Sequence, residues 1–354
     1  MSGTALTPEQ VVVLAHFGEA IPSCDLSGIV LARAPLRGSV FSQVRLRQAD
    51  LRNADLREAF LDQCDLSGCT LQGAQLRGAV FSRCTLTGVQ AGTSSWHAAK
   101  LLDCSAEDAD FAGADFNLAA FHRSILDRAD LSAALIDRVT MIDCSLKDAR
   151  LRAVHFHQCT LSGLALGGAD SSECTFDSVV FHKTDLSARS FRRQRLQGCQ
   201  FAQTLLADAD FGEASIRQCN FQGSTLERVN FGAASAANCV FANATASDCN
   251  FGAANLRQAL FSEAILQRCR FDAADLYQTH FADARIEQCS LRDADLTYAD
   301  LARARVAQCD LTGSRVTRTN LHRVEVSDSR MPDLAAALGT DPALARAERW
   351  PQTA

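Results

Sequence analysis

A five-residue period is plain in Ala49-Asp50-Leu51-Arg52-Asn53-Ala54-Asp55-Leu56, where two leucines stand five residues apart, each preceded by Ala-Asp. The period continues from Leu26 to Met331, since almost every residue whose number ends in 1 or 6 is Leu, Phe, Ile, Val or Met. The exceptions to this rule are Ala91, Trp96, Ala106, Ser171, Ala236 and Ala246. A period of five fits neither an α-helix nor a flat β-strand, so it predicts an internal repeat.

This period suits a coil of square cross-section, in which each side contributes one large inward residue and one small residue two places before it. No proline lies between Pro35 and Pro332, as expected of a β-ladder that needs every N–H group. With twenty residues in each coil, phenylalanines should stack on two opposite walls. One predicted row is Phe181, Phe201, Phe221, Phe241, Phe261 and Phe281, and the other is Phe191, Phe211, Phe231, Phe251 and Phe271.

These motifs resemble the pentapeptide-repeat family, whose repeat is Ala-(Asp/Asn)-Leu-x-x, and the resemblance covers residues 24–331. It implies an all-β fold, a right-handed quadrilateral β-helix (a pentapeptide-repeat solenoid) of about 15 coils with short terminal capping helices. The expected organisation is an N-terminal capping helix over residues 1–23, the β-solenoid over 24–331 and a helical tail over 332–354.

Helix signals stand at both ends of the repeat. Thr7-Pro8-Glu9-Gln10 predicts a helix start with a capping box, followed by about a dozen helical residues. Val11, Leu14 and Phe17 should then cover the open end of the solenoid. In the tail we expect a short helix over 332–338 closed by Gly339, and a second from Asp341-Pro342 to Trp350. The tail should cap the coil or pack against a twin, and the resemblance implies a homodimer formed through it.

Two places depart from the pattern. Trp96 is too large for its position and is flanked by the small centres Ala91 and Ala106, which predicts a bulge or a loop over residues 90–100. Near Arg189 and Gln194, which occupy small inward positions, lie three further arginines, Arg192, Arg193 and Arg195. Because burial of an unpaired guanidinium is costly, we expect a local bulge there, and we prefer this reading over a binding loop.

The cysteines and histidines, the residue types most often found in metal and catalytic sites, show no pattern that indicates such a site. All fifteen cysteines lie at the small inward position, where Cys behaves as a compact hydrophobe, and no C-x-x-C pair exists. His155 and His157 should both point outward, but no carboxylate or Cys supports them at ligand spacing. We find no Ser-His-Asp arrangement and no phosphate-binding glycine loop. We therefore expect no metal, no cofactor and no catalysis.

The net charge and its distribution limit which classes of partner the chain can bind. The formal net charge is −6, and residues 1–180 carry all of it while residues 181–354 sum to zero. This mild charge gives no basic field for direct nucleic-acid binding. No membrane-spanning segment and no targeting segment is visible, so we expect a cytoplasmic protein.

Two functions remain in competition, beside an inert spacer. Some pentapeptide-repeat proteins imitate DNA and bind type II topoisomerase, which requires a long negative surface. Here one acidic cluster stands out, composed of Asp103, Glu107, Asp108, Asp110 and Asp115. We favour a protein-binding scaffold or adaptor, because long family members also occur as accessory or effector proteins of bacterial secretion systems. The alternative is a DNA-mimicking modulator of type II topoisomerase (DNA gyrase).

One surface is a candidate for protein contact. Tyr277 and Tyr298 are the only tyrosines, and a twenty-residue coil makes them surface neighbours one coil apart. Arg257 and Arg318 should lie near the same line, and Tyr and Arg are enriched at interface hot spots. The alternative is that the two rings merely pack on each other across the ladder.

Overall fold

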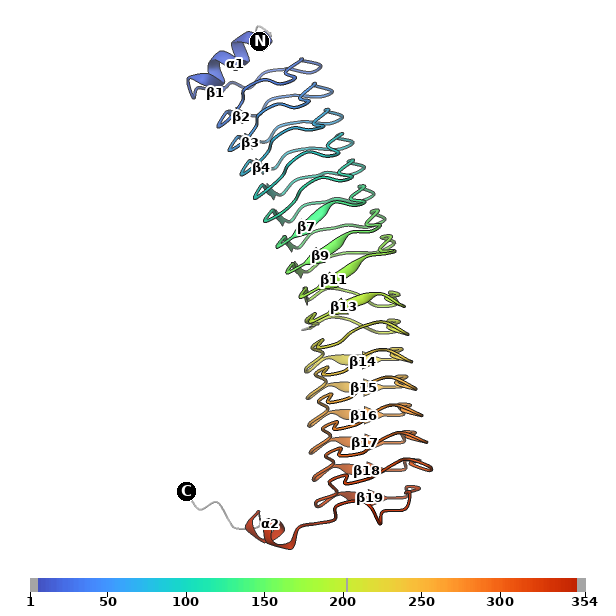
Figure 1. Ribbon diagram of the computed structural model, residues 1–354. Coiled ribbons are helices and arrows are strands. Elements are labelled where there is room, and N and C mark those ends of the chain that lie inside the picture. Colours follow the sequence, from blue (N-terminus) through green and yellow to red (C-terminus); the bar gives the residue numbers. More distant parts are fainter. Residues whose placement is uncertain (1–5, 202, 349–354) are drawn as a thin grey trace. The chain divides into compact units, whose positions relative to one another are not determined.

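The computed structural model describes residues 6–201 and 203–348. The chain forms two compact units, residues 1–180 and residues 181–354. Each unit is a stack of coils (Figure 1), and the fold is a parallel β-solenoid, with about fifteen turns in all and small helices at the termini. The predicted fold class is confirmed.

Short strands mark the sides of the coils. The helices are α1 (Pro8–His16) and α2 (Pro342–Ala347). Strands β1 to β6 are Ala20–Ile21, Val40–Ser42, Phe60–Asp62, Val80–Ser82, Lys100–Leu102 and Ala120–His122. Strands β7 to β12 are Leu135–Asp137, Thr140–Ile142, His155–His157, Thr160–Ser162, Thr175–Asp177 and Val180–His182. Strands β13 to β19 are Arg195–Gln197, Thr225–Glu227, Thr245–Ser247, Ile265–Gln267, Arg285–Glu287, Arg305–Ala307 and Glu325–Ser327.

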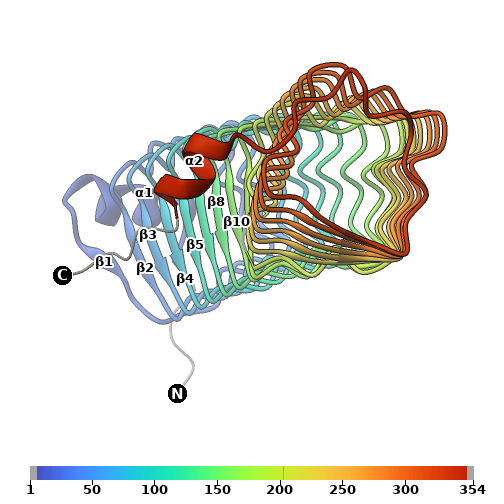
Figure 2. The same ribbon diagram turned by 90° about the horizontal axis from the view of Figure 1, so that it is seen from below.

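Pairing is parallel, and partners are twenty residues apart. In the first unit Phe41 pairs with Leu61, and in the second unit the strands from β14 to β19 pair in chain order, with Ile286 opposite Val306. The corners of the coils in the second unit therefore lie over one another (Figure 2). Because equivalent residues repeat at the same place on every coil, each row of outward side chains is a ladder.

At each corner of the coil, one residue adopts the left-handed backbone conformation. Every position whose number ends in 3 or 8, from Gly28 to Asp328, has a positive φ, for example +57° at Asn53 and +66° at Gly68. Glycine meets this conformation without a steric cost. The structure shows that the corner forms with or without glycine, so ladder bonds outweigh the modest cost that an L-residue pays there.

The phenylalanine rows form as predicted. In the second unit, neighbouring rings within one row lie 4.6–5.3 Å apart, from Phe201–Phe221 at 4.6 Å to Phe211–Phe231 at 5.3 Å. Rings of the two rows meet edge to face, as for Phe221 and Phe231 at 5.5 Å. The stacked and edge contacts both match the preferred geometries of aromatic pairs, which makes this stretch a dense apolar core.

The bulge or loop expected at Trp96 is absent, because the coil continues regularly through residues 90–100 and Trp96 is fully buried. Its ring lies 5.2 Å from that of Phe81, and its Nε1 donates to Ser94 Oγ at 2.7 Å. Ala91 and Ala106 are also fully buried. Their small side chains leave the volume that the indole fills, so the prediction was wrong because the three positions compensate one another.

The bulge expected around Arg189, Arg192, Arg193 and Arg195 is also absent. The ladder bonds continue in register, since Asp210 N donates to Arg189 O at 2.9 Å and Ser215 N donates to Gln194 O at 2.9 Å. Arg189 and Gln194 are partly exposed. The coil therefore accommodates both polar side chains, each only partly exposed, without inserting a residue.

Both ends differ in part from the expectation. The capping box of α1 is confirmed, with Thr7 N donating to Gln10 Oε1 at 2.9 Å. The helix has nine residues; Val11 is buried, but Phe17 is 72% exposed and does not cover the coil.

At the other end, residues 332–338 form no helix. They make a turn, after which Leu338 pairs with Asn320 on the last full coil. Helix α2 begins after Asp341 as predicted, and Trp350 lies outside the described residues.

Candidate protein-interaction surface

The structure brings together the four residues that the sequence singled out. The rings of Tyr277 and Tyr298 meet edge to face with centroids 5.6 Å apart. The guanidinium carbon of Arg257 lies 4.1 Å from the centroid of Tyr277, and that of Arg318 lies 5.8 Å from the centroid of Tyr298. We call Arg257, Tyr277, Tyr298 and Arg318 the Tyr–Arg row. It crosses four consecutive coils of the second unit.

The coil holds the Tyr–Arg row in place. Arg257 Nη1 donates to Asp275 Oδ2 at 3.1 Å, and Tyr277 N donates to Asp275 Oδ1 at 3.1 Å. Tyr298 remains 46% exposed. Cation–π contacts at exposed sites contribute about 0.5–1 kcal/mol each. These contacts hold the two rings in a fixed orientation on the ladder.

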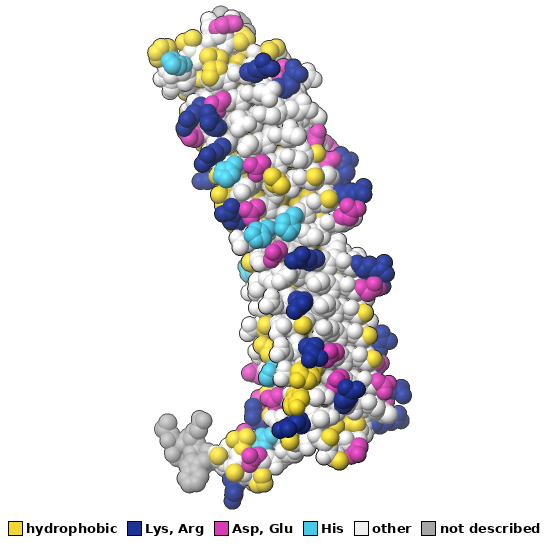
Figure 3. Space-filling model, in the orientation of Figure 1, with side chains coloured by type: hydrophobic (Ala, Val, Ile, Leu, Met, Phe, Trp, Pro, Cys, Tyr) yellow, Lys and Arg dark blue, Asp and Glu magenta, His cyan; other side chains and the backbone are white. Residues whose placement is uncertain are grey.

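The acidic cluster of the first unit is largely neutralised. Arg123 donates to Asp103 at 2.6 Å, and Arg128 donates to Asp108 at 2.8 Å while lying 3.6 Å from Glu107. The hydrogen bond from Arg128 lowers the pKa of Asp108. Such pairs recur over the visible face, where basic and acidic side chains lie side by side (Figure 3).

The cysteines are buried as predicted. Among them only Cys24 is partly exposed. Burial raises the pKa of Cys69 and of Cys239 to about 12, so these thiols stay protonated at neutral pH. Among the described residues, no group of three or more His, Cys, Asp or Glu side chains is arranged to hold a metal ion.

The histidine pair has a partner that sequence spacing did not reveal. His157 Nδ1 lies 2.7 Å from Asp137 Oδ1, one coil before it, and His155 Nδ1 is bonded to Thr175 Oγ1. The two imidazole rings lie 6.1 Å apart and nearly parallel. A carboxylate therefore supports His157 after all. A search at a spacing of twenty residues would have found it.

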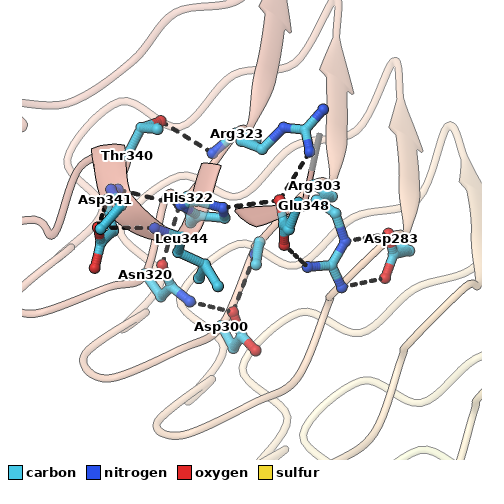
Figure 4. Close-up of polar contacts among 12 residues, drawn as sticks. Asp283, Asp300, Arg303, Asn320, His322, Arg323, Thr340, Asp341, Leu344 and Glu348 are labelled. Carbon is cyan, nitrogen blue, oxygen red and sulfur yellow. Dashed lines mark hydrogen bonds and ion pairs between the residues drawn. The ribbon is translucent and has the colours of Figure 1, made fainter. Parts of the chain in front are cut away.

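Sequence reasoning also missed a polar cluster at the C-terminal end (Figure 4). Glu348, at the end of α2, accepts hydrogen bonds from Arg323 Nη1 at 2.7 Å, Arg303 Nη1 at 3.2 Å and His322 Nε2 at 3.2 Å. The repeat spacing does not predict this cluster, because Glu348 lies outside the repeats and reaches the other three residues only when the tail folds back on the coil.

The described part of the chain contains no helix that is both long enough and apolar enough to span a membrane. The family model for pentapeptide repeats matches in eight copies, and the matched residues include 24–63, 60–91, 124–163, 195–232, 224–262, 254–293 and 289–328. No curated protein sequence matches the chain.

Three solved structures of similar proteins are QnrB1, Rfr23 and HetL. QnrB1, a plasmid-mediated fluoroquinolone resistance protein, is 22% identical, with 56% of this chain and 89% of that chain covered and a TM-score of 0.39. Rfr23 from the cyanobacterium Cyanothece 51142 is 23% identical, with 33% and 90% covered and a TM-score of 0.26. HetL from Nostoc sp. strain PCC 7120 is 18% identical, with 91% and 97% covered and a TM-score of 0.16.

Proposed function

Since the chain belongs to the pentapeptide-repeat family, we propose that it is a non-catalytic scaffold that binds a protein partner through the Tyr–Arg row. The proposal is carried by the contact of Tyr277 with Tyr298 and by the arginine on each of the two rings. Exposed aromatic rings flanked by guanidinium groups have the composition of interface hot spots. A repeat scaffold offers them on a rigid ladder.

The test is partner capture by the tagged full chain from its native lysate. We expect a protein retained by the wild type to be lost with Tyr277→Ala/Tyr298→Ala, after circular dichroism has shown an unchanged fold. The matched control is Gln288→Ala/Gln308→Ala, which removes another exposed pair on adjacent coils, bonded at 2.9 Å. Equal capture by the Tyr variant and the wild type would show that the row does not bind the partner.

The DNA-mimicking alternative gains no support from the acidic cluster. Three of its five carboxylates, those of Asp103, Glu107 and Asp108, face arginine side chains at 2.6–3.6 Å. Paired carboxylates contribute little negative field beyond a Debye length, about 8 Å at physiological salt. A role as accessory or effector protein of a bacterial secretion system, and a cytoplasmic location, remain part of the scaffold proposal. Fractionation of the native cell tests the location.

We also propose that the C-terminal end mediates a homodimer. Val326, Leu334 and Leu338 are 46%, 40% and 49% exposed there, and all three residues of β19 are exposed. Exposed apolar side chains at an edge strand favour association with a second copy. Sedimentation equilibrium should show a dimer for the wild type and a monomer for Val326→Asp/Leu338→Asp; a wild-type monomer at all concentrations would contradict the proposal.

A further inference from the structure

Three donors converge on one carboxylate at the C-terminal end of the second unit. Both oxygens of Glu348 are engaged, Oε1 by Arg303 and Oε2 by Arg323 and His322 (Figure 4). The side chain of His322 is only 3% exposed, whereas the side chains of Arg303 and Arg323 are about 40% exposed. These three side chains form a cluster of one buried donor and two partly exposed cations, and we call this cluster the pocket.

The pocket is ordered by groups other than Glu348. Arg303 donates to both carboxylate oxygens of Asp283 at 2.8 Å. His322 N donates to Asn320 Oδ1 at 3.0 Å, and Asn320 Nδ2 in turn donates to Asp300 Oδ1 at 2.8 Å. The coil ladder therefore positions the guanidinium of Arg303 and the backbone of His322 whether or not Glu348 is present, so the site is partly preorganised.

While α2 is docked, the backbone of the tail sets the tautomer of His322. Asp341 N donates to His322 Nδ1 at 3.1 Å, so Nδ1 carries no proton. The ring proton therefore lies on Nε2 and points at Glu348. A neutral imidazole of this tautomer offers its N–H to an acceptor, and a carboxylate oxygen is one.

The tail that fills the pocket is lightly attached. The segment before α2 is fixed to the coil as far as Leu338, whose N donates to Thr319 O and whose O accepts from Leu321 N, both at 2.8 Å. Beyond Gly339, the bonds from α2 and its N-cap to the coil run through Thr340, Asp341 and Glu348. No residue of α2 is buried. Little apolar surface is therefore lost when α2 swings away about Gly339.

We propose that Arg303, His322 and Arg323 form a carboxylate-recognition pocket that Glu348 occupies in the resting chain and that an acidic side chain of a protein partner occupies when α2 is displaced. This inference rests on the proposed scaffold function and adds a second contact that the tail regulates. The resident carboxylate shows which ligand the pocket accepts. Without Glu348, the two guanidinium groups have only Asp283 in contact, so the complementary ligand is an anion.

The experiment measures binding of a fluorescein-labelled peptide with the sequence of residues 339–348 to the full-length protein by anisotropy. In Glu348→Gln the pocket lacks its own carboxylate, and we expect the peptide to bind at least about ten-fold more tightly than to the wild type, in the usual range of coupling between competing ligands. The same peptide with Gln in place of its final Glu should bind weakly. Adding Arg303→Gln/Arg323→Gln to Glu348→Gln should abolish the gain.

The control protein is Glu325→Gln, which removes one negative charge from the same end without touching the pocket, and it should bind as the wild type does. Equal binding to the wild type and to Glu348→Gln overturns the proposal, as does equal binding of the Glu and Gln peptides. Displacement of the peptide by inorganic phosphate at lower concentration than by free glutamate also overturns it, because the pocket then prefers phosphate. None of these readouts involves the Tyr–Arg row, so failure here is distinguishable from failure of the proposed function.

Discussion

Trp96 is the largest side chain that the described residues bury completely. Its ring contacts Phe81, Phe111 and Phe116 with centroids 5.2–6.0 Å apart. An indole tolerates such a site because Ser94 accepts its one polar hydrogen. At the residue scale, the size of side chain that one core position accepts therefore depends on the side chains at the neighbouring positions.

Replacing Trp96 with Ala should destabilise the protein by about 3–5 kcal/mol, because the surrounding coil cannot collapse into the space left by the indole. The measurement is urea unfolding followed by circular dichroism. Phe17→Ala removes a ring that is 72% exposed and should change stability by less than about 0.5 kcal/mol. Similar losses for the two variants would mean that Trp96 does not pack in the core.

The thiols should be inert in the native protein. Fourteen of the fifteen cysteines are buried and one, Cys24, is partly exposed. Iodoacetamide at neutral pH should therefore label Cys24 first and the others only after denaturation, since the reagent cannot reach a buried thiol. Mass spectrometry counts the labels. Rapid modification of ten or more thiols in the folded chain would contradict the inward placement.

At the scale of the elements, the coil was predictable because a single period places every inward and outward residue. The phenylalanine rows follow directly from a spacing of twenty. The contact of Tyr277 with Tyr298 follows from the same coil, because Tyr298 lies one position past the residue twenty places after Tyr277. The segment 332–338 was not predictable from its own residues. A helix of one or two turns is marginal by itself, and here Leu338 gains ladder bonds to the last coil instead.

The arginines of the second unit should contribute little to stability. Arg192 and Arg193 both pair with Glu213 one coil away, but their side chains are 47% and 72% exposed. Exposed ion pairs contribute about 0–1 kcal/mol, so Arg192→Ala/Arg193→Ala should lower the melting temperature by no more than about 2–4 °C. Differential scanning calorimetry decides this. A larger shift would mean that the two side chains hold the coil.

Docking of α2 should depend on pH. Hydrogen bonds from Arg323, and next from His322, lower the pKa of Glu348 from 4.5 to about 2. A carboxyl whose pKa is lowered on folding stabilises the folded contact above its ordinary pKa, and the contribution disappears as pH falls from 4.5 toward 2. Hydrogen exchange of residues 339–348, corrected for intrinsic rates, should speed up across this window. In Glu348→Gln the exchange should be fast throughout, and a pH-independent wild type would rule the mechanism out.

At the scale of the whole molecule, charge divides between the two units. Residues 1–180 carry the entire net charge of −6, and residues 181–354 carry none. Many acids are matched one coil away, as in Arg228–Asp208 at 2.6 Å and Arg268–Asp248 at 2.7 Å. Because the repeat places acidic and basic side chains one coil apart, many of them form ion pairs. An acidic composition therefore does not by itself produce a continuous negative surface like that of DNA.

DNA gyrase provides the test at this scale. Because three of the five carboxylates of the acidic cluster are paired with arginine, micromolar protein should leave gyrase supercoiling of a relaxed plasmid unchanged, as read on an agarose gel. Arg123→Gln/Arg128→Gln frees Asp103 and Asp108 from their partners and should reveal whether unpaired acids alone are sufficient for inhibition. Asp108→Asn/Asp110→Asn is the matched variant with fewer charges. Inhibition by the wild type that weakens in this Asn variant would reverse the ranking and favour a DNA mimic; no inhibition by any variant would count against DNA mimicry.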